Sequence, residues 1–204
     1  MPQAPQVTRR PRAYPPPEFP PRKPKLFART PPAIFPSILG LLGLGLAARK
    51  GAEVLGLDQS PLGGLVEAAL GGLMILWLFA ITALFAKILR RVGVLVEDLR
   101  VLPGRSGLSA ATMSGMAAGA VLVPYAPGLA LVLVVAALVA HGLMALILIA
   151  TLARMAPEAR SVSPVFHLAF VAFILGALPL AQLGAIAAAT AIFWVTLTVA
   201  SAIW

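Results

Sequence analysis

The sequence lacks cysteine and is poor in acidic residues. None of its 204 residues is a cysteine, and only 7 are Asp or Glu, against 16 Lys and Arg. The absence of cysteine excludes disulfide scaffolds, thiolate catalysis and cysteine-ligated metal sites. The sequence also contains no Walker loop, no metal-binding motif, and no serine, histidine and acid constellation. We therefore expect no enzyme and no metal site.

Charged residues of both signs make up only 11% of the chain, whereas hydrophobic residues make up 60%. Because soluble domains carry roughly 25% charged residues, this composition indicates an integral membrane protein. The formal net charge of +9 would suit nucleic acid if the cations formed a soluble basic face. They cluster instead beside apolar segments, where they act as topology signals and lipid headgroup contacts. We expect a lipid bilayer, and no nucleic acid, as partner.

Residues 1–30 form a basic, proline-rich arm without a long apolar run. Its closely spaced prolines prevent a helix and favour extended or polyproline II conformations. Two roles are open: a cytoplasmic tail held near anionic lipid, or an arm that lies along a partner protein. The cations of this arm are Arg9, Arg10, Arg12, Arg22, Lys23, Lys25 and Arg29.

Residues 31–204 contain six apolar runs that are candidates for crossing the hydrocarbon layer, which takes about 20 helical residues. Between the second and third runs, apolar residues recur at helical spacing from Val92 to Leu99, which predicts a short amphipathic helix at the interface. We predict an all-α integral membrane protein in which these residues form one six-helix transmembrane domain. The expected spans cover about residues 33–48, 62–89, 108–123, 128–153, 162–180 and 184–204.

The distribution of basic residues predicts the topology. Lys and Arg are frequent in the arm, between spans two and three, and between spans four and five, whereas the other connections are neutral or balanced. The positive-inside rule then places the N-terminus in the cytoplasm. Short connections pair the spans as three helical hairpins. The odd spans are shorter and rich in small residues, so we expect them inside, with the longer even spans outside.

The first span, PPAIFPSILGLLGLGLAARK, combines a proline, an aromatic residue, a Leu-Gly step, a second glycine and a basic stop. Further along are Trp77, the basic end AKILRR, the interfacial Glu97 and Asp98, and the spans SAATMSGMAAGAVLVP and SPVFHLAFVAFILGAL. Over about residues 31–204 this pattern resembles the N-terminal part of the tellurite-resistance TehA and slow-type anion channel family, which includes C4-dicarboxylate transporters.

The resemblance implies a bacterial inner-membrane protein for small anions. In that family ten helices form five hairpins around an apolar pore, with the odd helices inside and an aromatic gate on the ninth. The resemblance assigns six residues to the pore wall, although small residues of this kind serve close helix packing equally well. They are Gly40, Gly43, Ser114, Gly115, Gly119 and Gly176.

Six spans supply three of the family's five hairpins, and three hairpins do not close its ring. The resemblance therefore leaves two functions open. The chain is either a TehA-like channel or transporter protein for small anions, whose path needs further helices, or a non-conducting accessory or assembly subunit. The second would dock through its helices and its arm on other membrane subunits, in a homo-oligomer or a hetero-complex.

Two ionisable residues inside the expected spans are candidates for a functional site. His141 lies near the middle of span four, where a neutral imidazole would hydrogen-bond a neighbouring helix. The alternative is axial ligation of a haem or chlorophyll-type pigment, for which Ala137 and Gly142 would leave room; otherwise no cofactor is expected. Glu67 lies near the start of span two, as a solvated or capping carboxylate or as a group for proton coupling or cation binding.

Overall fold

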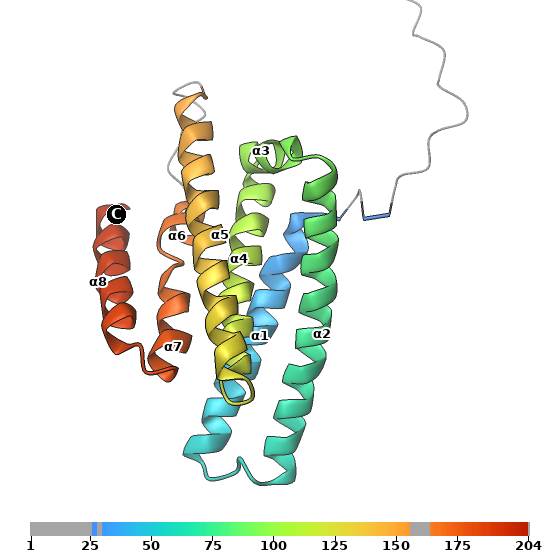
Figure 1. Cartoon of the computed structure of the whole chain (residues 1–204), viewed down its shortest axis with the longest axis vertical. Coiled ribbons are helices and arrows are strands. Elements are labelled where there is room, and N and C mark those ends of the chain that lie inside the picture. The colour runs from blue at the N-terminus through green and yellow to red at the C-terminus, as the bar shows by residue number, and fades with distance from the viewer. Residues whose placement is uncertain (1–25, 28–29, 156–163, 204) are drawn as a thin grey trace, which may run out of the picture.

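The computed structural model describes residues 26–27, 30–155 and 164–203, and within these ranges the regular secondary structure is helical. All seven cations assigned to the basic arm lie outside the described residues, so neither role of the arm is tested. Figure 1 shows the order of the helices. Their bounds are η1 Pro32–Ile34, α1 Phe35–Val54, α2 Pro61–Arg90, α3 Gly93–Arg100, α4 Leu102–Leu122, α5 Pro127–Ala153, α6 Val165–Phe170, α7 Ile174–Gln182 and α8 Ile186–Ile203.

Five helical segments are long and apolar enough to cross a membrane, which indicates an integral membrane protein, as the composition predicts. The all-α fold is also confirmed, and α3 forms where the amphipathic helix is expected. The arrangement of six spans as three membrane hairpins stays a prediction. The candidate spans are Pro32–Val54, Pro61–Arg90, Pro127–Ala153, Val165–Gln182 and Ile186–Ile203.

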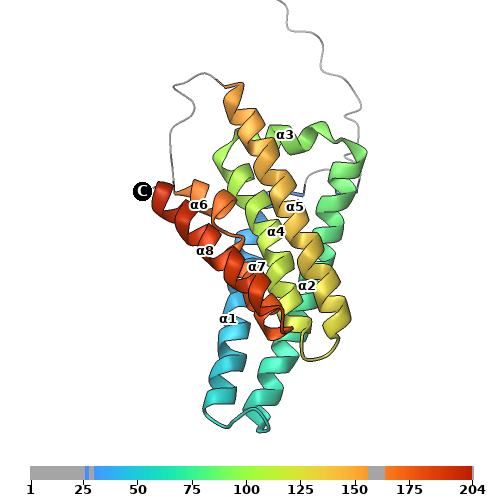
Figure 2. The ribbon, with the colours of Figure 1, turned by 60° about the vertical axis from the view of Figure 1, so that its left-hand side comes forward.

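The helix α4 covers the expected third span but is not among these candidates, because it is rich in Gly, Ser and Ala rather than in large apolar residues. It is nevertheless the most buried helix, with 16 of its 21 residues buried. In the candidate spans only 11% to 33% of the most apolar window is buried. Small side chains let α1, α3, α5, α6 and α7 approach α4 closely, so α4 forms the centre of the fold (Figures 1 and 2).

The expected fifth span is not one continuous helix. It consists of α6 and α7, which are separated by a turn over residues 171–173. The backbone N–H groups of Ile174, Leu175 and Gly176 bond to carbonyl groups three residues earlier, so the chain tightens and redirects before α7 begins. Hydropathy alone gives no sign of this break, because the turn residues Val171, Ala172 and Phe173 are apolar.

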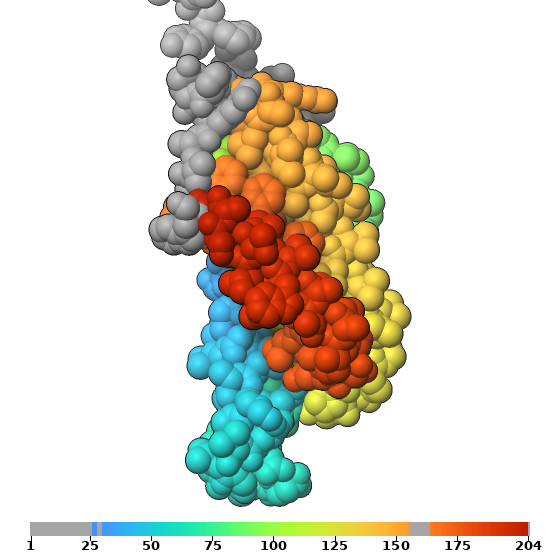
Figure 3. All heavy atoms as spheres, turned by 90° about the vertical axis from the view of Figure 1, so that its left-hand side faces the viewer, coloured from blue at the N-terminus to red at the C-terminus, as the bar shows by residue number. Residues whose placement is uncertain are grey.

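Apart from the turn between α6 and α7, the described connections between consecutive helices lie at two ends of the molecule. The α1–α2, α4–α5 and α7–α8 connections lie at one end, which we call the turn end, and α3 lies at the other, the α3 end (Figures 1 and 2). Two glycines with positive φ permit turn-end connections, Gly56 at 66° and Gly184 at 81°. At the turn end, α1 and α2 extend past their neighbours (Figure 3).

The two ends differ in charge. Among the described residues, the α3 end carries six Lys or Arg and two acidic residues, whereas the turn end carries two Lys or Arg and three acidic residues. The α3-end cations are Lys87, Arg90, Arg91, Arg100, Arg105 and Arg154.

Candidate functional site

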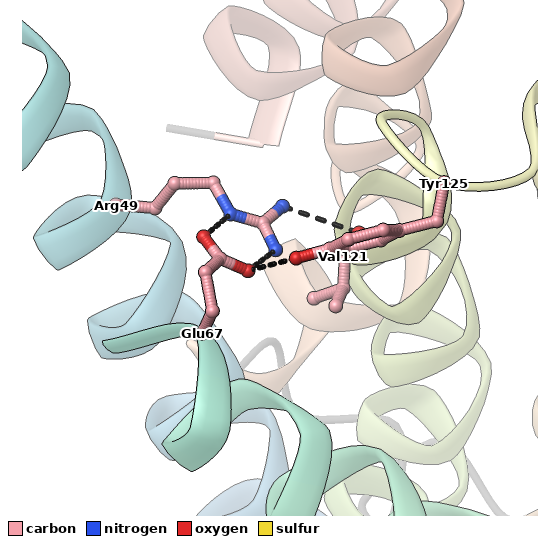
Figure 4. A network of polar contacts seen from close by, with 4 residues as sticks. All are labelled: Arg49, Glu67, Val121 and Tyr125. Atoms are coloured by element: carbon pink, nitrogen blue, oxygen red, sulfur yellow. Dashed lines mark hydrogen bonds and ion pairs between the residues drawn. The ribbon is translucent and has the colours of Figure 1, made fainter. Parts of the chain in front are cut away.

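A polar cluster joins three parts of the chain near the turn end (Figure 4). Arg49 on α1 donates from Nε to Oε1 of Glu67 at 2.7 Å and from Nη2 to Oε2 at 2.6 Å. Its Nη1 donates to the carbonyl oxygen of Val121, near the end of α4, at 3.2 Å. Tyr125, in the α4–α5 turn, donates its hydroxyl to Oε2 of Glu67. We call these four residues the Arg49 cluster.

The centre of the Arg49 cluster is a bidentate ion pair between Arg49 and Glu67, where α1 and α2 meet the α4–α5 turn. Planar guanidinium and carboxylate groups with two parallel hydrogen bonds form the strongest kind of protein ion pair. The Arg49 side chain is 11% exposed and that of Glu67 is 36% exposed, so water screens the pair only partly. The carboxylate that accepts the phenolic hydrogen bond also raises the pKa of Tyr125 above its ordinary value. The cluster therefore fixes α1 and α2 against the α4–α5 turn.

The alternatives that the sequence left open for Glu67 did not include this ion pair. The sequence signal was weak: a cation near the end of one helix and an acid near the start of the next, across a short polar connection. Spacing along the chain does not reveal that Tyr125, 58 residues after Glu67, completes the cluster.

A groove of about 680 Å³ lies beside the Arg49 cluster, between α1, α4 and α7. Most of its lining is apolar, with small residues at Gly43 and Ala47 of α1 and at Ala117 and Ala120 of α4. Towards the turn end its lining includes Arg49, Lys50, Glu53 and Gln182. We call this the α1–α4–α7 groove. It is an apolar surface hollow with a charged mouth.

The structure places the six residues assigned to a pore wall or to close packing in two settings. Gly40 and Gly43 are exposed on α1, and no atom of the described residues outside their own helix lies within 4 Å of where a Cβ would be. Of the six, Gly43 lines the α1–α4–α7 groove. On the same helix, Gly45 faces the other way, since its Cβ would lie 2.4 Å from a methyl group of Leu70 on α2.

The remaining four residues pack against other helices. A Cβ on Gly119 would lie 2.3 Å from Val134, one on Gly115 would lie 3.0 Å from Ala137, and one on Gly176 would lie 2.7 Å from Leu138, all three neighbours being on α5. Ser114 is fully buried; its Oγ accepts from Nε1 of Trp77 at 3.0 Å and donates to the Ala111 carbonyl at 2.7 Å. These four residues let α2, α4, α5 and α7 approach one another closely.

His141 is fully buried between α5 and its neighbours. Its Nδ1 lies 2.7 Å from Oγ1 of Thr112 on α4, and its ring meets the ring of Phe173 edge to face at 4.6 Å between centroids. Its Nε2 makes no hydrogen bond of good geometry within the described part of the chain, although the Ala169 backbone is close by. His141 does not line the cavities of about 350, 470 and 680 Å³ among the described residues, so this geometry gives no support to a haem or pigment ring.

The described residues contain no group of three or more His, Cys, Asp or Glu side chains placed to hold a metal ion. Comparison of the chain with protein families, with curated proteins and with solved structures found no match.

Proposed function

We propose that this chain is a subunit of a larger membrane assembly, and that it docks further transmembrane helices on the α1–α4–α7 groove. The observation that carries the proposal is the hollow of about 680 Å³ that the three helices leave between them. In a bilayer, a hollow lined by glycine and alanine allows another helix backbone to approach closely, and such close approach drives helix association.

The contrast with the other helices supports this assignment. The outer faces of α2 and α5 expose large apolar side chains such as Ile75 at 71%, Phe79 at 63% and Leu146 at 63%, as expected of surfaces in contact with lipid. Along α1, by comparison, Gly40, Gly43 and Ala47 lie at spacings of three and four residues and are exposed. Residues at these spacings share one helix face, so this face resembles a helix contact more than a lipid contact.

Site-specific crosslinking tests the docking face, and the absence of native cysteine makes every introduced thiol unique. We expect Gly43→Cys and Ala47→Cys, carrying a thiol-linked photo-crosslinker, to form in membranes a discrete adduct with the same partner. That partner is either a second copy or one other protein. Ala150→Cys is the matched control, since Ala150 is also an exposed alanine, on α5 and outside the groove. Equal adduct yields at positions 47 and 150 would contradict the proposal.

A second candidate function is passage of small anions along the completed groove. The specific observation is that the groove is lined by α1, α4 and α7, which overlap the three odd spans that the TehA resemblance assigns to a pore wall. Cations at its mouth, Arg49 and Lys50, would raise the local anion concentration. Since the groove is open, the docked helices would supply the missing wall.

Chloride flux into liposomes tests this second function. We expect flux from the protein together with its docked partner, and a lower flux for Lys50→Gln. This change removes an exposed groove cation whose ion pair among the described residues is with Glu53. Arg154→Gln is the control, since it removes an exposed cation outside the groove. A flux no greater than that of empty liposomes would rule out conduction and leave the docking proposal intact.

A further inference from the structure

A second hollow, of about 470 Å³, lies between α2 and α5. We call it the α2–α5 crevice. Its floor is a different face of α4, with Ala111 and Gly115, and Leu95 of α3 contributes to its lining. It is therefore distinct from the docking groove, which α4 lines with Ala117 and Ala120.

The α2 side of the crevice is lined by large residues such as Trp77 and Phe85, whereas the α5 side includes three alanines where the two helices would otherwise meet. Both α2 and α5 pack on α4 rather than on each other. On α5 the facing positions are Ala136, Ala137 and Ala140, and two of these, Ala136 and Ala140, are exposed. Leucine in place of these alanines would fill the space between α2 and α5, so the small side chains leave the crevice open.

The described residues of the lining offer no free hydrogen-bonding side chain to a ligand. Among them, the only side chains with N or O atoms are Trp77 and Thr112, and both are engaged internally. Nε1 of Trp77 donates to Ser114, and Oγ1 of Thr112 donates to the Ser109 carbonyl at 2.8 Å and contacts His141. A polar group placed here would be buried without a partner, which is costly. The occupant that fits is a hydrocarbon chain.

Among the described residues, the α3 end is the more positively charged end of the molecule. Leu95 of α3 and Ile88 of α2 line the crevice, and the neighbouring Lys87 and Arg91 pair with Asp98 and Glu97. Among the described residues, this end carries six Lys or Arg and two acidic residues. One of these cations, Arg100, is exposed; its backbone carbonyl accepts from Arg105, but its side chain makes no hydrogen bond or ion pair within the described part of the chain. An anionic headgroup complements this charge.

We propose that the α2–α5 crevice binds one acyl chain of an anionic phospholipid, whose headgroup lies at the α3 end. The hollow is within the range of about 300–1,000 Å³ found for small-molecule sites. Burial of the chain against aliphatic and aromatic side chains favours occupancy, and the cations select the headgroup charge. A zwitterionic lipid matches the crevice but not the charge at its end.

Quenching of Trp77 by brominated lipid tests the proposal, because Trp77 lines the crevice and is only 5% exposed overall. In a variant in which Trp194 and Trp204 are replaced by phenylalanine, Trp77 is the only indole. The protein is placed in phosphatidylcholine nanodiscs with a rising fraction of phosphatidylglycerol brominated on its acyl chains. We expect quenching that saturates at a low fraction of this lipid, and weaker, non-saturating quenching by brominated phosphatidylcholine.

Variants on α5 locate the effect. Ala140→Leu, and independently Ala136→Leu, fill the crevice and should abolish the saturable quenching. Ala150→Leu, an exposed alanine of α5 outside the crevice, should leave it unchanged. Equal quenching by the two brominated lipids, no quenching by either, or saturable quenching that survives both crevice variants would overturn the proposal.

A headgroup variant tests the charge. Arg100→Gln should raise the fraction of phosphatidylglycerol needed for half-maximal quenching by about fivefold, the order of effect of one cation at an anionic surface. Lys50→Gln removes a cation at the turn end and should not change this fraction. An identical shift in both variants would show that net charge, and not the α3 end, governs binding, and would refute the placement of the headgroup.

Discussion

Breaking the ion pair of the Arg49 cluster provides the sharpest test of the fold. The pair makes two hydrogen bonds of 2.6 and 2.7 Å between charged groups. Such bonds contribute about 1.5–3 kcal/mol when well protected from water, whereas exposed ion pairs contribute about 0–1 kcal/mol. Because Arg49 is 11% exposed and Glu67 is 36% exposed, we expect a coupling energy of about 1–2 kcal/mol.

A double-mutant cycle measures this coupling energy. It compares Arg49→Gln, Glu67→Gln and the double variant, and it separates the pair from the bonds that Arg49 makes to Val121 and that Tyr125 makes to Glu67. The free energy of unfolding is measured in mixed micelles with rising denaturing detergent, with helicity as the signal. If the single effects add to within about 0.5 kcal/mol, the two side chains do not interact as drawn in Figure 4.

The neighbouring ion pair provides the control. Lys50 and Glu53 are one turn apart on α1, with a 2.7 Å contact and side chains 74% and 46% exposed. The same cycle on this pair should give a coupling energy of at most about 0.5 kcal/mol. The difference between the two coupling energies isolates the effect of burial and of the bidentate hydrogen bonding.

Three further predictions follow from single contacts. Gly119→Ala should destabilise the protein by about 1–2 kcal/mol, since its Cβ would overlap a valine of α5, whereas Gly40→Ala, in open space, should be neutral or stabilise by about 0.5 kcal/mol in the same assay. Ser114→Ala should cost about 1–3 kcal/mol of unfolding free energy, because it leaves a buried indole N–H without its acceptor. Tyr125 should ionise above its ordinary pKa, and Glu67→Gln should lower that pKa, as measured by tyrosinate absorbance with the chain's other tyrosine replaced by phenylalanine; an unchanged titration would contradict the hydrogen bond.

Much of the helical framework follows from the apolar runs themselves. The expected spans 62–89 and 128–153 agree closely with Pro61–Arg90 and Pro127–Ala153, because proline opens each helix and a cation follows or ends it. The turn at 171–173 could not be predicted, since its residues are as apolar as the helices around it.

The surroundings of each glycine also could not be predicted from the sequence. Gly40, Gly43 and Gly45 lie within six residues on one helix. The described structure leaves space for a Cβ at the first two, whereas a Cβ at Gly45 would overlap Leu70. Which face of α1 meets α2 depends on the position of the whole helix, and the sequence pattern does not fix that position. The Arg49 cluster could not be predicted from the sequence for the same reason, because its members come from three different parts of the chain.

The burial of α4 has a consequence for biogenesis. This central helix is one of small and polar residues, and a buried arginine, Arg105, lies near its start. A nascent segment of this composition partitions weakly from the translocon into lipid by itself, whereas α5, which follows after a short turn, is strongly apolar. We therefore expect α4 to remain outside the hydrocarbon layer until α5 has been synthesised, so that the two enter as a pair. The order of synthesis then determines when the centre of the fold can form.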